Sequence, residues 1–125
     1  MKIKSIACIA IAVLLGAAMA QADTIVKSDN TDDLDLASSW ETTVPGASDI
    51  ASWDSTVTAA NTAYLGSDQN WSGVTVTDAG GLVTVKQAVS NATALTLGAD
   101  GIDMSSSSVD LYLQPLLTLS ADQTW

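Results

Sequence analysis

Short segments in which apolar residues occupy every second position recur through the second half of this chain. Alternation with a period of two places one side of a β-strand in a core and the other side in water. Residues that tolerate turn geometry, mainly Gly, Asn, Asp and Ser, fill the gaps between the segments. The pattern therefore predicts an all-β fold. The predicted strands include residues 74–76, 82–85, 95–97, 109–113 and 116–119.

The spacing of these segments indicates how the strands are arranged. Aligning the apolar-Thr-apolar triplet 74–76 with the triplet 95–97 gives an offset of 21 residues, and aligning 95–97 with 117–119 gives 22. A period in the low twenties, with two or three short strands in each period, matches one turn of a parallel β-helix. Stacked turns of such a helix share a continuous apolar interior. An antiparallel β-sandwich also contains many short strands separated by turns, and it is the alternative.

Residues 1–22 have the pattern of a secretory signal peptide. Lys2 and Lys4 precede an apolar run over residues 6–15, and residues 18–22 contain two overlapping small-x-small cleavage patterns. The apolar run is shorter than the roughly 20 residues that a membrane-spanning helix needs. We therefore expect a helical leader that engages the secretion machinery and is cleaved, and a protein that is secreted or held on the outer cell surface. An uncleaved anchor or a buried helix is the alternative.

Removal of this leader sharpens the charge balance. Lys27 and Lys86 then supply two positive charges against 14 acidic residues, a formal net charge of −12. Such a chain cannot neutralise a row of phosphates, so DNA and other nucleic acids are excluded as partners, as is an anionic membrane surface. The sequence contains no His, and its single Cys8 lies in the leader. Nucleophilic catalysis of the Ser-His-Asp or Cys-His kind and zinc binding are therefore not expected.

The region between the leader and the repeating segments differs in composition. We expect residues 23–64 to form an N-terminal β capping region and residues 65–125 to form the β-helix coils. A short strand is predicted at 24–26, followed by an acidic loop. The loop misses the spacing, the Gly and the terminal Glu of an EF-hand, so a solvated loop is favoured over a calcium site. Its acidic residues are Asp29, Asp32, Asp33 and Asp35.

Two further sets of residues are candidates for a functional role. Trp40 and Trp53 flank a Val-Pro-Gly turn at 44–46, and their rings are expected to close one end of the core, since aromatic side chains dominate burial energetics. The alternative is that they present flat faces to a glycan. Asp100 and Asp103 form the best-placed carboxylate pair, although a solvated Asp-Gly turn is the favoured interpretation. No catalytic residue, metal ligand or cofactor is predicted.

The chain resembles the start of bacterial autotransporter-associated β-strand repeat proteins. The similar features are the signal peptide, Trp40, the turn at 44–46 with the following Asp49 and Ala51-Ser52-Trp53, Asn70-Trp71, and coils ending in LTLSADQTW at 117–125. The resemblance implies a right-handed parallel β-helix in the passenger region of a large secreted or surface protein.

We therefore expect an exported, non-catalytic structural or adhesin-like passenger region. Its expected partner outside the secretion machinery is a cell-surface or extracellular polysaccharide. We also expect the chain to be the N-terminal piece of a longer protein. The alternative is a polysaccharide-binding module or the start of a β-helical carbohydrate-active enzyme, because Asp and Glu side chains serve as acid, base or calcium ligand in such enzymes.

Overall fold

The computed structural model describes residues 21–123. The predicted signal helix, apart from Gln21 and Ala22, and the terminal Trp125 lie outside the described residues. In the described part of the chain, no helix has the length and apolar character needed to traverse a lipid bilayer.

The described residues form eight strands and one short 3-10 helix. The strands are β1 (Thr24–Val26), β2 (Ile50–Trp53), β3 (Asn61–Tyr64), β4 (Gln69–Val76), β5 (Val83–Lys86), β6 (Ala94–Asp103), β7 (Leu111–Leu113) and β8 (Leu116–Leu119), and the helix is η1 (Ala37–Ser39).

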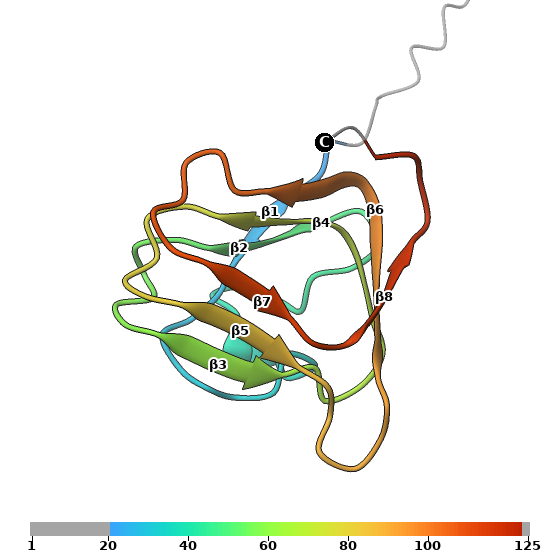
Figure 1. The fold of residues 1–125 in the computed structure, drawn as a ribbon, viewed down its shortest axis with the longest axis horizontal. Helices are drawn as coiled ribbons and strands as arrows, with labels where there is room; N and C mark the ends of the chain where they lie inside the picture. The colour runs from blue at the N-terminus through green and yellow to red at the C-terminus, as the bar shows by residue number, and fades with distance from the viewer. Residues whose placement is uncertain (1–20, 124–125) are drawn as a thin grey trace, which may run out of the picture.

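All named strands pair in parallel. The order in one sheet is β1-β2-β4-β6-β8 and the order in the other is β3-β5-β7, so from β2 onward the chain alternates between the sheets as it advances (Figure 1). Neighbouring strands therefore belong to successive turns of the chain. This arrangement is a parallel β-solenoid of about four coils. The predicted parallel β-helix is confirmed, and the antiparallel sandwich is wrong; the right-handed sense stays a prediction.

The five-stranded sheet is bent within β4 and β6, so the coils that contain these two strands have three sides. The first part of β6 pairs with β8 through residues 94–97, and its last part pairs with β4 through residues 101–103. Figure 1 shows β6 turning the corner between these two parts. At the corner, β6 holds two more residues than β4 between paired positions.

Glycine makes this corner possible. Gly101 has a φ of 59°, a left-handed conformation that residues with a side chain rarely adopt. On the neighbouring coil, a Cβ atom added to Gly73 would lie 2.9 Å from the carbonyl oxygen of Gly101. The two backbones therefore approach too closely for a larger residue at position 73.

The core lies between the three sides of the coils. It consists mainly of inward-facing positions on the strands, and these residues stack on their register partners from neighbouring coils. Parallel in-register pairing explains this stacking, because residues that face inward on one strand are paired with residues that face inward on the next. The buried strand residues of the core are Ile25, Ala51, Trp53, Ala63, Trp71, Val74, Val76, Val83, Val85, Leu95 and Leu97.

One of the two predicted alignments is wrong. The triplets at 95–97 and 117–119 are in register with an offset of 22, as predicted. Val74, however, pairs with Ile102 rather than with Leu95, and the partner of Leu95 is Gln69. The reason is that β4 and β6 each cover two sides of the coil, so a short triplet can match either side of the next strand.

Strands on the two sides of residue 64, where the capping region was expected to end, pair with one another. β1 and β2, from the expected capping region, lie in the same sheet as β4, and β3 pairs with β5 across the boundary. Within that region, the segment between β1 and β2 covers the edge of the sheet that contains β3. The N–H of Leu34 donates to the carbonyl oxygen of Tyr64 at the outer edge of β3. The side chain of Leu34 is fully buried.

Two register partners allow a test of the stacked core. Leu95 has no exposed surface, whereas Leu117, at the same inward position on the last coil, is 46% exposed. We expect Leu95→Ala to lower the free energy of unfolding by about 3 kcal/mol and Leu117→Ala by about 1 kcal/mol, because only the first leaves a closed cavity. Urea denaturation of both variants measures the difference. Equal losses would contradict the register between β6 and β8.

Candidate functional site

Three tryptophans from successive segments meet inside the coils. The ring centroids of Trp40 and Trp53 are 5.7 Å apart with an interplanar angle of 73°, and those of Trp40 and Trp71 are 5.8 Å apart at 80°. Edge-to-face geometry of this kind is favoured by the quadrupoles of aromatic rings. Trp40 is 4% exposed, and Trp53 and Trp71 are not exposed at all. The rings therefore form an aromatic core cluster.

This arrangement corrects the glycan-contact hypothesis for Trp40 and Trp53. A pair of rings that binds a sugar has to be exposed and similarly oriented, whereas these rings are buried and nearly perpendicular. The indole N–H of Trp40 donates to the carbonyl oxygen of Leu34 at 2.9 Å, and this bond fixes the position of the ring within the segment between β1 and β2. These residues stabilise the first coils and present no face to a ligand.

The polar atoms of the cluster give a second test. The indole N–H of Trp53 donates to Oδ1 of the buried Asn61 at 3.2 Å, whereas the indole nitrogen of Trp71 has no hydrogen-bond partner among the described residues. Trp53→Phe leaves Asn61 without this donor, and Trp71→Phe removes an unsatisfied N–H. We expect Trp53→Phe to lower the free energy of unfolding by about 1 kcal/mol more than Trp71→Phe. Thermal and urea unfolding of the two variants test this difference, and the reverse order would contradict it.

The acidic loop is organised by a buried lysine. Lys27 follows β1 and has no exposed surface. Its ammonium group donates to the carbonyl oxygens of Ser28 and Asn30 at 3.0 and 2.9 Å and to Oδ1 of Asn30 at 2.8 Å, which satisfies its three donors. The amide of Asn61 also donates to the Asn30 carbonyl oxygen at 2.8 Å, so the loop is tied to β3. The lysine thus holds the loop against the coil.

The acidic residues of this loop do not gather into a metal site. Within residues 21–123, no three His, Cys, Asp or Glu side chains lie in a group that could hold a metal ion. Asp32 instead accepts a hydrogen bond from the hydroxyl of Ser38 at 2.7 Å, and Asp29 accepts one from Thr58 at 2.6 Å. These contacts fix the conformation of the loop.

Burial lowers the pKa of Lys27 from 10.5 to about 8, although the nearby carboxylates of Asp32 and Asp29 act in the opposite direction. Between these two pH values the unfolded chain binds a proton that the native chain has lost. The Lys27 contribution to the free energy of unfolding therefore rises as the pH increases through this window.

We expect Lys27→Met to abolish this contribution. The free energy of unfolding of the natural chain, measured relative to that of the variant, should increase between pH 8 and 10.5. All other residues are the same in both proteins, so the difference isolates the contribution of Lys27. Urea denaturation over this pH range measures it, and an NMR titration of the Lys27 side chain measures the pKa directly. Parallel pH profiles would contradict the assignment.

The carboxylate pair predicted at 100 and 103 lies on the surface at the corner of β6. Asp100 accepts a hydrogen bond from the hydroxyl of Ser72 on the neighbouring coil. Asp103 is fully exposed and accepts a hydrogen bond from the N–H of Ser105 at 2.9 Å, and this bond lowers its pKa. Each carboxylate therefore has a local partner that shapes a turn or a corner.

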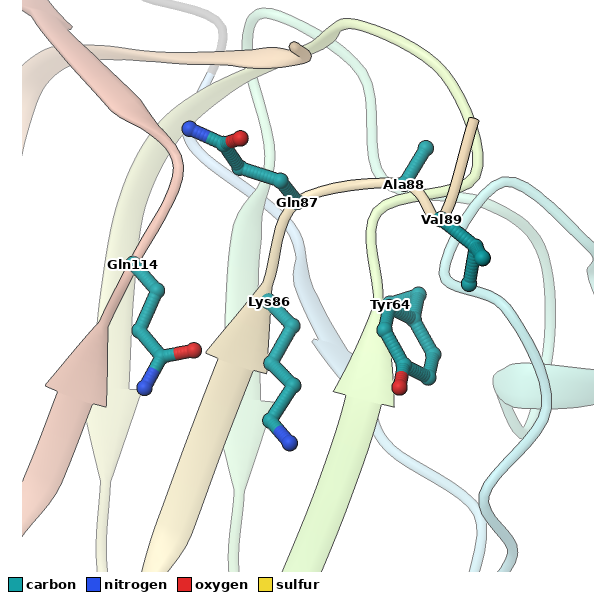
Figure 2. A pocket seen from close by; sticks show the side chains of 6 residues that line it. All are labelled: Tyr64, Lys86, Gln87, Ala88, Val89 and Gln114. Carbon is teal, nitrogen blue, oxygen red and sulfur yellow. The ribbon is translucent and has the colours of Figure 1, made fainter. Parts of the chain in front are cut away.

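A pocket of about 410 Å³ lies where β3 and β5 end. Figure 2 shows Tyr64, Lys86 and Gln114 side by side at the ends of neighbouring strands, with Ala88 and Val89 on the segment that follows β5. Tyr64 and Lys86 are register partners. The N–H of Gln114 donates to the carbonyl oxygen of Val85, which extends the same ladder by one coil. Gln87 completes the lining.

This pocket is missing from the sequence analysis, in which Lys86 appeared only as a charge. The signal that was available is the offset of 22 between Tyr64 and Lys86, which equals the offset between 95–97 and 117–119. Gln114 follows at an offset of 28, because the segment between β5 and β7 is longer. An irregular offset of this kind cannot be recognised without the strand register.

Comparison of the chain with protein-family models, with curated proteins and with solved structures finds no match.

Proposed function

We propose that this chain is part of an exported, non-catalytic structural or adhesin-like β-solenoid that is displayed on the cell surface or secreted, as the resemblance to autotransporter-associated repeat proteins implies. The observation that carries the proposal is the stack of parallel coils itself. Its inward positions are filled by core residues, and its outward positions form rows of side chains from successive coils. Such a stack is a scaffold that presents an extended surface.

The composition supports export. The sequence contains one Cys, which lies within the predicted leader, and the remaining chain is strongly acidic. A net charge far from zero favours solubility outside the cell. Stability of the coils rests on hydrogen-bonded ladders and stacked side chains, which do not depend on the redox compartment.

A polysaccharide-binding module or the start of a carbohydrate-active enzyme is the second candidate function. The pocket at Tyr64, Lys86 and Gln114 favours it, because a ring, a cation and an amide lie side by side there. Small-molecule sites typically combine an apolar wall with a few polar groups in this way. The carboxylates at 100 and 103 give it less support, since each has a local structural partner.

Export is tested by expressing the chain with its own leader in a bacterial host. We expect intact-mass spectrometry of the exported fraction to show a chain that begins at Gln21 or Asp23, after one of the small-x-small patterns. Replacement of Lys2 and Lys4 by Glu should block export, because the leader then lacks its positive n-region. The control, Ala20→Leu with Ala22→Leu, should reach the membrane but stay uncleaved. A full-length chain that remains in the cytoplasm contradicts the proposal.

A further inference from the structure

We propose that the pocket between the ends of β3 and β5 binds a carboxylated sugar, such as a uronate unit of an acidic polysaccharide. The choice of a polysaccharide as ligand rests on the adhesin-like function proposed above. The residues that would contact it are Tyr64, Lys86, Gln87 and Gln114. No part of the proposal requires a chemical reaction.

The two lysines of the described chain have different roles. Lys27 is buried, and its ammonium group is saturated by three acceptors. Lys86 is half-buried at the pocket, and its Nζ lies 5.8 Å from the centre of the Tyr64 ring. Between residues 21 and 123, no carboxylate forms an ion pair with Lys86 Nζ, and the lining of the pocket contains no acidic residue. The cation of the pocket is therefore available to an anionic ligand.

The charge of the pocket lining is opposite in sign to the net charge of the chain. The whole chain carries a formal charge of −10, which repels anions at long range. Exposed charges are largely screened beyond a distance of about 8 Å at physiological ionic strength. Of the residues that line the pocket, only Lys86 carries a charge, so the nearest charge to a bound carboxylate within the lining is positive.

The remaining lining matches the rest of a sugar ring. Gln87 and Gln114 each carry an amide with two donors and one acceptor, the groups that pair with vicinal hydroxyls. Tyr64 and Val89 supply apolar surface, and Val89 is 85% exposed at the rim. A volume of about 410 Å³ lies in the lower part of the range found for small-molecule sites. A short acidic saccharide fits this combination of charge, amides and apolar surface.

The wall of the pocket is an addition to the repeating coil. Four residues separate Tyr64 from Gln69, whereas eight residues separate their register partners Lys86 and Leu95. The four extra residues belong to the segment that carries Ala88 and Val89, next to the row of outward side chains. The longer connection after β5 therefore forms one wall of the pocket. The connection after β3, on the previous coil, lacks these four residues.

The proposal is tested by NMR titration of the ¹⁵N-labelled chain with trigalacturonate, and with the neutral galactose trisaccharide as the comparison probe. We expect trigalacturonate to shift the resonances of Tyr64 and of the Gln87 and Gln114 side-chain amides. Lys86→Gln should weaken its binding about tenfold, and Lys86→Arg should retain it. Binding should also weaken as the salt concentration rises.

Thr96→Glu is the matched control, because it changes the net charge by −1, as Lys86→Gln does, on the outer face of the other sheet. We expect Thr96→Glu to bind trigalacturonate with an affinity within twofold of that of the natural chain. The ¹⁵N spectra of all variants report whether they are folded.

Three outcomes of the titration would overturn the proposal. They are equal affinity of Lys86→Gln and the natural chain for trigalacturonate, equal affinity of the natural chain for the neutral trisaccharide, and shifts confined to residues outside the pocket. Equally strong binding of a tri-glutamate peptide would overturn it too, in favour of an acidic-peptide site. Failure of export leaves this binding result unaffected, so the two proposals fail separately.

Discussion

In-register parallel pairing between successive coils is the constraint on which the rest of this structure depends. Each backbone hydrogen bond of a ladder fixes which residue of one coil lies on which residue of the next. Inward positions consequently form columns, such as Trp71, Leu97 and Leu119, and outward positions form rows, such as Tyr64 and Lys86. The core and the pocket are thus two consequences of the same register. A shift of one residue would turn Lys86 into the interior and Val85 out of it.

The two ends of the stack differ in how far their apolar residues are covered. On the first coils, the segment between β1 and β2 supplies Leu34 and Trp40 as an apolar cover, and the ammonium group of Lys27 satisfies the carbonyl oxygens of the loop that carries them. On the last coil, the leucines of β8 retain about half of their surface within the described residues. A buried charge at the covered end is tolerable only because every donor has an acceptor, and its lowered pKa is the sign of the residual desolvation cost.

The sequence predicts the strands far better than it predicts the connections between sides of a coil. Alternating segments identified the strands at 24–26, 95–97 and 116–119, because a period of two is a local property. The pairing of Val74 with Ile102 was missed, since β4 and β6 bend around a glycine corner that has no periodic signature. The glycan hypothesis failed for a related reason. A tryptophan near a turn is compatible with both exposure and burial, and only the stacking of three coils decides between them. Lys27 entered the sequence analysis only as one of two positive charges, and its burial within its own loop was not predicted.

A solenoid can acquire a binding site at a corner without disturbing its core. The strands set the register, so residues added between them project outward and leave the ladders in place. The connection after β5 illustrates this, since four additional residues precede Leu95, which still stacks on Gln69. Substitutions and insertions at such corners change the exposed surface, while the columns of core residues continue to stabilise the coils. In this chain the added residues stand beside Lys86, the half-buried cation of a strongly acidic protein. A positive charge and an added stretch of chain therefore coincide at one corner of one coil, and substitutions there leave the buried columns of the core unchanged.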